Sequence, residues 1–154
     1  LRPLPYAQPD RLVKFWDTSA LLPVFLDEAS TPACRQHMAD DPGVIVWEGT
    51  CVELLSVLAR WQRHSRGMDD LWPGVRAEMI RQWRTWLRVA DWQRISPHAQ
   101  RIVTMHPLKA GDAMQLAAAI AAADGQPDQL PVVTRDHTLA KAAQLEGFPV
   151  IIPA

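Results

Sequence analysis

The sequence predicts a three-layer α/β domain in which a mostly parallel sheet is flanked by helices. Three observations support this fold class: strand-like and helix-like segments alternate, the strand-like segments are apolar throughout, and no long linker or internal repeat interrupts them. Continuously apolar strands are typical of parallel sheets that helices cover on both faces. With 154 residues, 48% of them hydrophobic, the chain is long enough for one domain with a sizeable core.

The alternation begins in the first half of the chain. The apolar run LVKFW predicts the first strand, and VIVW, after the turn residues Asp-Pro-Gly, predicts the second. Val52, Leu55 and Leu58 recur at helical spacing, and Gly67 is a stop signal for that helix. The predicted elements, in order, are a strand at Leu12–Trp16, helices at Thr18–Glu28 and Thr31–Ala39, a strand at Val44–Trp47 and a helix at Cys51–Arg66.

The second half continues the same pattern. The apolar runs LPVVT and PVII predict two late strands, and the alanine-rich segment GDAMQLAAAIAAA predicts a helix that is buried on most sides. The predicted elements, in order, are a helix at Trp72–Val89, a short strand at Trp92–Ile95, helices at Pro97–Met105 and Gly111–Ala123, a strand at Leu130–Thr134, a helix at Thr138–Gly147 and a last strand at Pro149–Ile152.

Composition bounds the class of protein. Residues 1–10, with three prolines, are expected to form a poorly ordered leader, and residues 11–154 the folded domain. The longest apolar-rich stretch, Ala113–Ala123, is too short to cross a bilayer, and no export signal is recognisable. Cys34 and Cys51 lack a metal-binding spacing and are expected to be reduced packing residues. We therefore expect a cytoplasmic protein that does not enter a membrane.

Four acidic residues stand near one edge of the predicted sheet. Asp17 directly follows the first strand, and Asp136 lies just beyond the strand that ends at Thr134. Glu53 and Asp112 lie in the first turns of two predicted helices. In α/β folds, the strand ends that lead into helices form the crevice where ligands bind. Clustered carboxylates repel one another unless a hard cation with oxygen ligands, such as Mg²⁺ or Mn²⁺, compensates them, so the sequence predicts a metal site here.

Each acid also has an ordinary structural explanation. Asp17 and Asp112 are suited to capping the helices that follow them, and Asp136 is suited to a turn. Glu53 is harder to explain in this way because its neighbours are apolar, whereas Glu48 is interpreted as ordinary first-turn charge. The cluster is favoured because all four acids fall at one edge of the sheet.

Four sequence blocks surround these acids: DTSALL, VELLSVLAR, HPLKAGDAMQLAAA and VVTRDHTLAKAAQLEGFPVI. In this order they resemble the signature blocks of PIN-domain ribonucleases, and in particular the VapC toxins of bacterial type II toxin–antitoxin pairs. The resemblance runs from about Leu12 to Ile152, which is nearly the whole chain. Any one block is weak, but four blocks in the family order are a specific signal.

The resemblance implies a Mg²⁺- or Mn²⁺-dependent endoribonuclease that forms a homodimer and is silenced by a VapB-like antitoxin. It also implies cleavage that leaves a 5′-phosphate and a 3′-hydroxyl. Because no Ser/His or Cys/His nucleophile pair is evident, a metal-activated water is the expected nucleophile, with one or two metals. The implied catalytic and metal-binding residues are Asp17, Glu53, Asp112 and Asp136, with Ser19 and Thr134 as supporting hydroxyls.

An arginine-rich segment supports a polyanionic substrate. Residues 60–101 contain nine arginines and four acids, and arginine both suits phosphate and stacks on bases. Arg81 and Arg84 are the substrate-binding candidates in this segment, although a solvated helix face explains them equally well. Lys109 and Arg135 are candidates because each lies close in sequence to a predicted metal ligand.

The main alternative is a non-catalytic PIN-like module that only binds RNA or a protein partner, and a metal-dependent nuclease assay distinguishes the two. A haloacid-dehalogenase-type phosphatase would have an acid where Ser19 stands. A response-regulator receiver would have an acidic pair where Lys14, Phe15 and Trp16 stand. The seven tryptophans are assigned to core or dimer packing in preference to base stacking.

Overall fold

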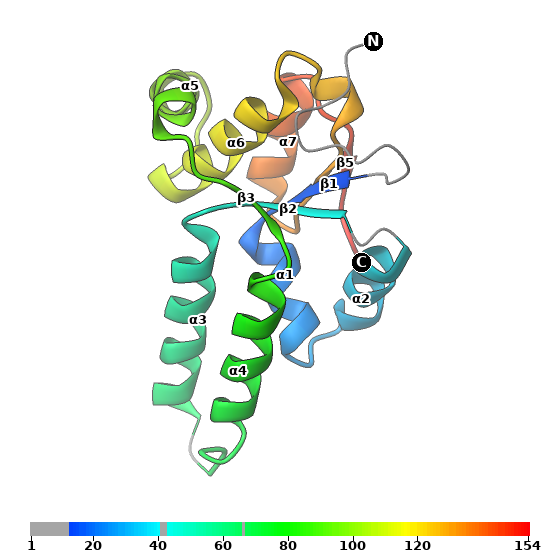
Figure 1. The fold of residues 1–154 in the computed structure, drawn as a ribbon, viewed down its shortest axis with the longest axis vertical. Coiled ribbons are helices and arrows are strands. Elements are labelled where there is room, and N and C mark those ends of the chain that lie inside the picture. Colours follow the sequence, from blue (N-terminus) through cyan, green and yellow to red (C-terminus); the bar gives the residue numbers. More distant parts are fainter. Residues whose placement is uncertain (1–12, 41–42, 66) are drawn as a thin grey trace.

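The computed structural model describes residues 13–40, 43–65 and 67–154 (Figure 1). The predicted leader, residues 1–10, lies outside the described residues. The elements in chain order are β1 (Val13–Trp16), α1 (Thr18–Phe25), α2 (Thr31–Asp40), β2 (Gly43–Trp47), α3 (Thr50–His64), α4 (Trp72–Trp83), β3 (Leu87–Val89), α5 (Trp92–Met105), α6 (Ala110–Ala123), the 3₁₀ turn η1 (Pro127–Gln129), β4 (Val132–Val133), α7 (His137–Leu145) and β5 (Val150–Ile151).

The five strands form one parallel sheet in the order β3-β2-β1-β4-β5. β1 lies at its centre, where Phe15 is opposite Ile45 of β2 on one side and Val132 of β4 on the other. β-branched and aromatic side chains suit such a doubly covered strand. The predicted α/β class with a mostly parallel sheet is confirmed, and the carboxyl ends of β1 and β4 meet at one edge.

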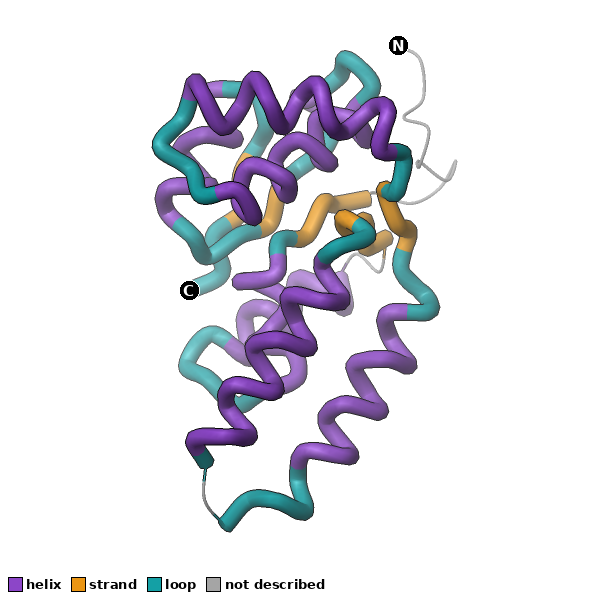
Figure 2. Tube along the Cα trace, turned by 90° about the vertical axis from the view of Figure 1, so that its left-hand side faces the viewer, coloured by secondary structure: helices purple, strands orange, loops and turns teal. Residues whose placement is uncertain are grey.

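Helices cover both faces of the sheet (Figures 1 and 2). Successive strand residues point to opposite faces, so Phe15 packs on the side of α5, α6 and α7, and Trp16 on the side of α1, α3 and α4. Both side chains are fully buried. The alanines of α6 are buried along nearly its whole length, as predicted, which lets this helix pack closely on the sheet.

α3 and α4 lie side by side as a helical hairpin that extends away from the sheet (Figure 1). α3 begins directly after the turn that follows β2, so its first turn lies at the sheet edge and its later turns lead outward. Leu58 of α3 and Trp72 of α4 are buried in one small cluster that holds the hairpin together. Glu53 therefore stands at the sheet end of a helix that runs away from the core.

The predicted helix at Trp72–Val89 is wrong beyond Trp83. The chain turns there, with Thr85 Oγ1 donating to the Gln82 carbonyl at 2.7 Å, and then forms β3 against β2. Trp83 and Trp86 are three residues apart, as on one helix face, but they meet edge to face across the turn at 6.2 Å between ring centroids. A tertiary contact therefore imitates helical periodicity, and the third strand of the sheet lies within the predicted helix.

The short strand predicted at Trp92–Ile95 is also wrong, because these residues form the first turn of α5. The signal is the residue before it: Asp91 caps the helix, and its side chain accepts a hydrogen bond from the Arg94 amide. Pro97, the predicted start, lies inside α5. The other predicted helices are confirmed with shifted ends, and the strand predicted at Leu130–Thr134 is shortened to β4.

None of the helices in the described part of the chain has both the length and the apolar character that a membrane span requires.

Candidate active site

The four predicted acids line one cavity of about 470 Å³ at the carboxyl edge of the sheet. They come from four different places in the chain: the residue after β1, the first turn of α3, the first turn of α6 and the residue before α7. The cavity is lined by Asp17, Thr18, Ser19, Leu22, Val52, Glu53, Ser56, Val57, Arg60, Asp112 and Asp136. The structure thus brings the four acids together at the edge where the strands of the parallel sheet end, as the sequence predicts.

Asp17 is the most deeply buried of the four, with 4% of its surface exposed. It caps α1, and its Oδ2 accepts hydrogen bonds from the Ser19 hydroxyl at 2.5 Å, the Thr134 hydroxyl at 2.9 Å and the Ser19 amide at 3.2 Å. Burial raises the pKa of the Asp17 carboxyl to about 6, although these hydrogen bonds lower it, and the charge of Glu53 raises it further. The predicted supporting residues Ser19 and Thr134 therefore contact this carboxylate directly.

Glu53 is held in place by a buried polar network. Its Oε2 accepts hydrogen bonds from the Thr18 hydroxyl and from Gln115 Nε2, the latter at 2.8 Å. Gln115 also donates to the hydroxyls of Thr18 at 2.9 Å and Thr50 at 3.0 Å. At Gly111 a Cβ would lie only 3.2 Å from Glu53 Oε1, so the glycine lets the start of α6 approach this carboxylate closely.

Asp112 and Asp136 face the other two acids from α6 and α7. Burial raises the pKa of Asp112, the negative charges of Asp136 and Glu53 raise it further, and the charge of Lys109 lowers it. Asp136 caps α7, with Oδ1 accepting from the Leu139 amide at 2.8 Å. Asp136, whose ordinary explanation was a turn residue, is thus a helix cap in the structure, and the same side chain lines the cavity.

The acids of the cavity share one further property. In the described part of the chain, none of the four forms an ion pair, whereas six other carboxylates each pair with an arginine. Those six are Asp27, Glu28, Glu48, Glu78, Asp124 and Glu146. Among the described residues, the four cavity acids therefore have no basic side chain paired with them.

No metal coordination sphere is preformed by these side chains. Across residues 13–40, 43–65 and 67–154, no three His, Cys, Asp or Glu side chains are placed to hold a metal ion together. The donors around the cavity are nonetheless carboxylate and hydroxyl oxygens, the ligand type that Mg²⁺ and Mn²⁺ prefer.

The predicted substrate-binding residues are dispersed. Lys109 precedes α6 and is exposed, close enough for its charge to act on Asp112. The Arg135 guanidinium pairs with Glu28 at 2.7 Å, and its backbone amide donates to the Ser19 hydroxyl. Arg81 and Arg84 line a separate cavity of about 560 Å³ on α4, where Arg81 forms two hydrogen bonds with Glu78. The structure thus does not bring Arg81 and Arg84 to the acids.

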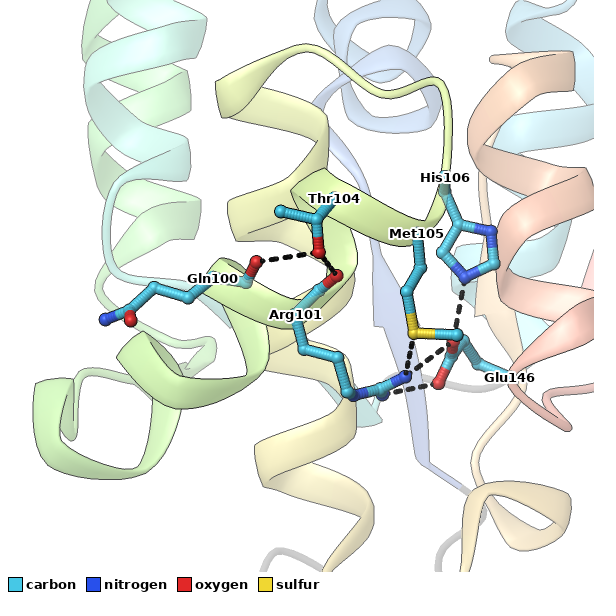
Figure 3. Close-up of polar contacts among 6 residues, drawn as sticks. All are labelled: Gln100, Arg101, Thr104, Met105, His106 and Glu146. Atoms are coloured by element: carbon cyan, nitrogen blue, oxygen red, sulfur yellow. Dashed lines mark hydrogen bonds and ion pairs between the residues drawn. The ribbon is translucent and has the colours of Figure 1, made fainter.

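A second polar cluster braces the loop that leads into α6 (Figure 3). Glu146, after α7, accepts hydrogen bonds from Arg101 at 2.6 and 3.0 Å and lies 2.7 Å from His106 Nε2. Hydrogen bonding from Arg101 lowers the pKa of Glu146, and His106 lowers it as well. Because His106 begins the loop before Lys109 and Asp112, this cluster fixes the approach to one of the four acids.

Sequence reasoning did not single out Gln115, Thr18 or Arg60 as residues of the site. Gln115 interrupts an alanine-rich helix three residues after Asp112, and a buried amide among alanines is a signal that could have identified it. Thr18 is hidden by its role as the first residue of α1. Arg60 lies seven residues after Glu53, the spacing that returns a helix to the same face.

Comparison with known proteins agrees with this fold. The family model for the PIN domain matches residues 14–145, so the chain belongs to the PIN domain family. PIN domains are generally nucleases, and they typically use divalent metals.

Two solved structures are similar in fold. One is a toxin–antitoxin complex from Klebsiella pneumoniae, 19% identical with a TM-score of 0.61, covering 92% of this chain and 98% of that chain. The other is the crystal structure of PAE2754 from Pyrobaculum aerophilum, 18% identical with a TM-score of 0.61, covering 96% of this chain and 90% of that chain. No curated protein sequence matches the chain.

Proposed function

We propose that this protein is a Mg²⁺- or Mn²⁺-dependent endoribonuclease, the VapC-type toxin of a bacterial toxin–antitoxin pair, acting on RNA in the cytoplasm. The observation that carries the proposal is the convergence of Asp17, Glu53, Asp112 and Asp136 on one cavity in a PIN-family chain. Their lack of cationic partners in the described part of the chain supports it, because an uncompensated acid cluster favours a bound cation.

The hydrogen bonds of three acids suggest how such a cation would be held. In the described part of the chain, the bonds to Asp17 all reach Oδ2, those to Glu53 reach Oε2, and the bond to Asp136 reaches Oδ1. Each carboxylate therefore has one oxygen fixed by the protein and a second one available. These three acids, together with Asp112, would hold the metal. The bound metal would act as a Lewis acid toward the attacking water and the phosphodiester.

The other residues of the cavity orient these ligands. Ser19 and Thr134 fix the Asp17 carboxylate, and their donated hydrogen bonds favour its charged form against the cost of burial. Thr18 and Gln115 fix Glu53 in the same way. Such partners commonly change metal affinity or activity by about 10–100-fold, because they set ligand geometry. Arg135 is not assigned to the substrate in this proposal, because its guanidinium is paired with Glu28.

The test is cleavage of single-stranded RNA with Mg²⁺ or Mn²⁺, with EDTA as the blank. Wild-type protein should cleave only with metal, and products should carry a 5′-phosphate and a 3′-hydroxyl. Cleavage that persists in EDTA would contradict the metal mechanism. Folded wild-type protein that binds RNA but never cleaves it would leave the alternative, a non-catalytic PIN-like binding module.

The partner we propose is an antitoxin whose basic side chain enters the acid cavity. An Arg or Lys placed near Asp17 and Asp112 would replace the metal by charge-assisted hydrogen bonds and block substrate at the same time. The fold similarity to a protein of a toxin–antitoxin complex motivates this partner, and we propose a homodimer as the assembly that it inhibits. A complex structure in which the acid cavity stays open and metal-filled would rule out this mode of inhibition.

A further inference from the structure

The acid cavity continues along α3 beyond the acids. Glu53, Ser56, Val57 and Arg60 all line it, and their spacing places them on one face of the helix. Seven residues of helix correspond to about 10 Å along the axis, so Arg60 lies well outside the acid cluster, toward the free end of the hairpin. The cavity is therefore acidic at the sheet end and basic at its outer end.

Arg60 carries an uncompensated positive charge. Six other arginines pair with carboxylates, but Arg60 forms no ion pair with any acid in the described part of the chain. It pairs with none of the four cavity acids, although it shares their cavity. An exposed guanidinium left free at the mouth of an anionic site is suited to an anion that enters beside the acids.

A second hollow adjoins Arg60 on its outer side. This cavity of about 370 Å³ is lined by Arg60, Trp61, His64 and Ser65, so the two cavities meet at the arginine. Trp61 is 39% exposed, unlike Trp16, Trp72 and Trp83 in the core. His64 Nδ1 donates to the Arg60 carbonyl at 2.7 Å, and this bond fixes the imidazole ring beside Arg60. An aromatic face next to a cation is the arrangement that single-stranded nucleic acids use for base stacking beside a backbone contact.

We propose that Arg60 binds the RNA backbone phosphate next to the scissile one, and that the base of this neighbouring nucleotide stacks on Trp61. The substrate strand then runs outward along α3 from the acids. This inference rests on the proposed function, because that function places the scissile phosphate at the acids. Binding of RNA at Arg60 and Trp61 can nevertheless be measured without cleavage. It replaces the packing role predicted for Trp61 with a substrate contact.

The binding test uses the full chain in EDTA and a fluorescein-labelled single-stranded RNA of mixed sequence, followed by anisotropy across a salt series. Arg60→Gln should weaken binding about tenfold and should lower the slope of log affinity against log salt by about 0.7, the value for one lost phosphate contact on a single strand. Trp61→Ala should weaken binding about fivefold or more with an unchanged slope, since stacking carries no counterion release. Arg60→Lys should restore the slope.

Arg76→Gln is the matched control. Arg76 also lies on the helical hairpin, but it lines the separate cavity on α4, beside Gln62. Its loss should therefore leave the salt slope of RNA affinity unchanged. Thermal melting should show all variants folded. An Arg60→Gln protein with the affinity and salt slope of wild type would overturn the proposal, as would an equal slope change in Arg76→Gln.

Cleavage separates this inference from the proposed function. With Mg²⁺ or Mn²⁺, Arg60→Gln should raise KM for the long RNA with little change in kcat, and it should not affect a dinucleotide, which has no second phosphate. If wild type cleaves and Arg60→Gln matches it on long RNA, the subsite is wrong and the nuclease stands. If wild type never cleaves but binds RNA through Arg60, the subsite stands and the nuclease is wrong.

Discussion

Carboxylates occur in two opposite environments in this molecule, the acid cavity and the cluster around Glu146. In the cavity, burial raises the pKa of Asp17 to about 6, and burial with neighbouring acids raises that of Asp112. Around Glu146, hydrogen bonds from Arg101 and His106 lower the pKa of the carboxyl (Figure 3). The same chemical group is therefore destabilised as an anion in one region and stabilised in the other.

The difference shows which acids are neutralised by cations of the described residues and which are not. Glu146 is neutralised locally and joins α5, the loop before α6 and the end of α7. The four cavity acids instead face one another with hydroxyl and amide donors but without cations from the described part of the chain. Four unpaired acids gathered in one cavity, with no arginine or lysine of the described residues bound to them, keep their charge available for a ligand, which is how the cavity supports metal binding.

The largest expected effect comes from Asp17→Asn, which removes the most buried charge but keeps the side-chain volume and the capping oxygen. RNA cleavage with Mg²⁺ or Mn²⁺ should fall by more than about a hundredfold, since even residues that only orient metal ligands contribute up to that much. Asp112→Asn should behave in the same way, and excess Mn²⁺ should rescue little. Glu48→Gln is the control, because Glu48 is exposed and pairs with Arg88 outside the cavity. Folded Asp17→Asn protein with wild-type activity would contradict the metal-nuclease proposal.

The same variant should be more stable than wild type in EDTA. The folded pKa of Asp17 is raised from 3.8 to about 6, so ionising it costs stability as pH rises through that range, and the full cost applies above about pH 6. Asn lacks this cost, and the gain should be on the order of 2 kcal/mol at neutral pH and vanish below about pH 4. Thermal melting against pH measures it. A gain that is independent of pH would assign the effect to packing instead of charge.

Gln115→Leu should have the next largest effect. The substitution removes the amide that donates to Glu53, Thr18 and Thr50. The leucine that replaces it has a similar size and suits the apolar surroundings of the alanine-rich helix. Mn²⁺ affinity, measured by calorimetry, should fall about 10–100-fold because Glu53 loses an orienting partner. Gln144→Leu, at an exposed position of α7, is the matched control and should bind Mn²⁺ normally. Unchanged affinity in a folded Gln115→Leu protein would mean that Thr18 alone orients Glu53.

How far sequence reasoning reached differs between the acids and the arginines. Asp17, Glu53, Asp112 and Asp136 could be placed together because strand ends in a parallel sheet meet at one edge, whatever the details of packing. No such rule applies to the arginines, whose direction depends on which helix face packs inward.

Two local signals were also ambiguous. The Trp83 and Trp86 spacing fits a helix, but a turn and an edge strand produce the same spacing when the two rings pack together. The apolar residues at the start of α5 resemble a strand, but Asp91 before them caps a helix. In the first case tertiary packing, which a local window does not contain, decides the structure, whereas in the second the deciding signal is the local cap.

Glu146→Gln tests the cluster in which a carboxylate is neutralised by Arg101 and His106. The folded pKa of Glu146 lies below its ordinary value of 4.5, so its contribution to stability is complete above that value and is lost as pH falls through the lower folded pKa. The substitution should therefore destabilise the protein by about 1–2 kcal/mol at neutral pH, with the difference shrinking in acid. Glu48→Gln, which removes one exposed acid from a pair at 3.5 Å, should change stability by much less. Equal losses in both variants, or a loss at Glu146 that persists in acid, would show that burial and not charge pairing distinguishes this cluster.

The smallest effect is expected from charge reversal at Arg81 and Arg84. Both line the cavity on α4, away from the acids, and Glu78 already neutralises Arg81 through two hydrogen bonds at 2.8 and 2.6 Å. Glu at both positions should weaken RNA binding a few-fold at low salt, through the overall field of the hairpin, and the difference from wild type should fade as salt screens it. Metal uptake should remain normal. A loss of affinity as large as that of Arg60→Gln, with an equal change in salt slope, would instead place the RNA path across α4 and not along the α3 face that carries Arg60 and the cavity acids.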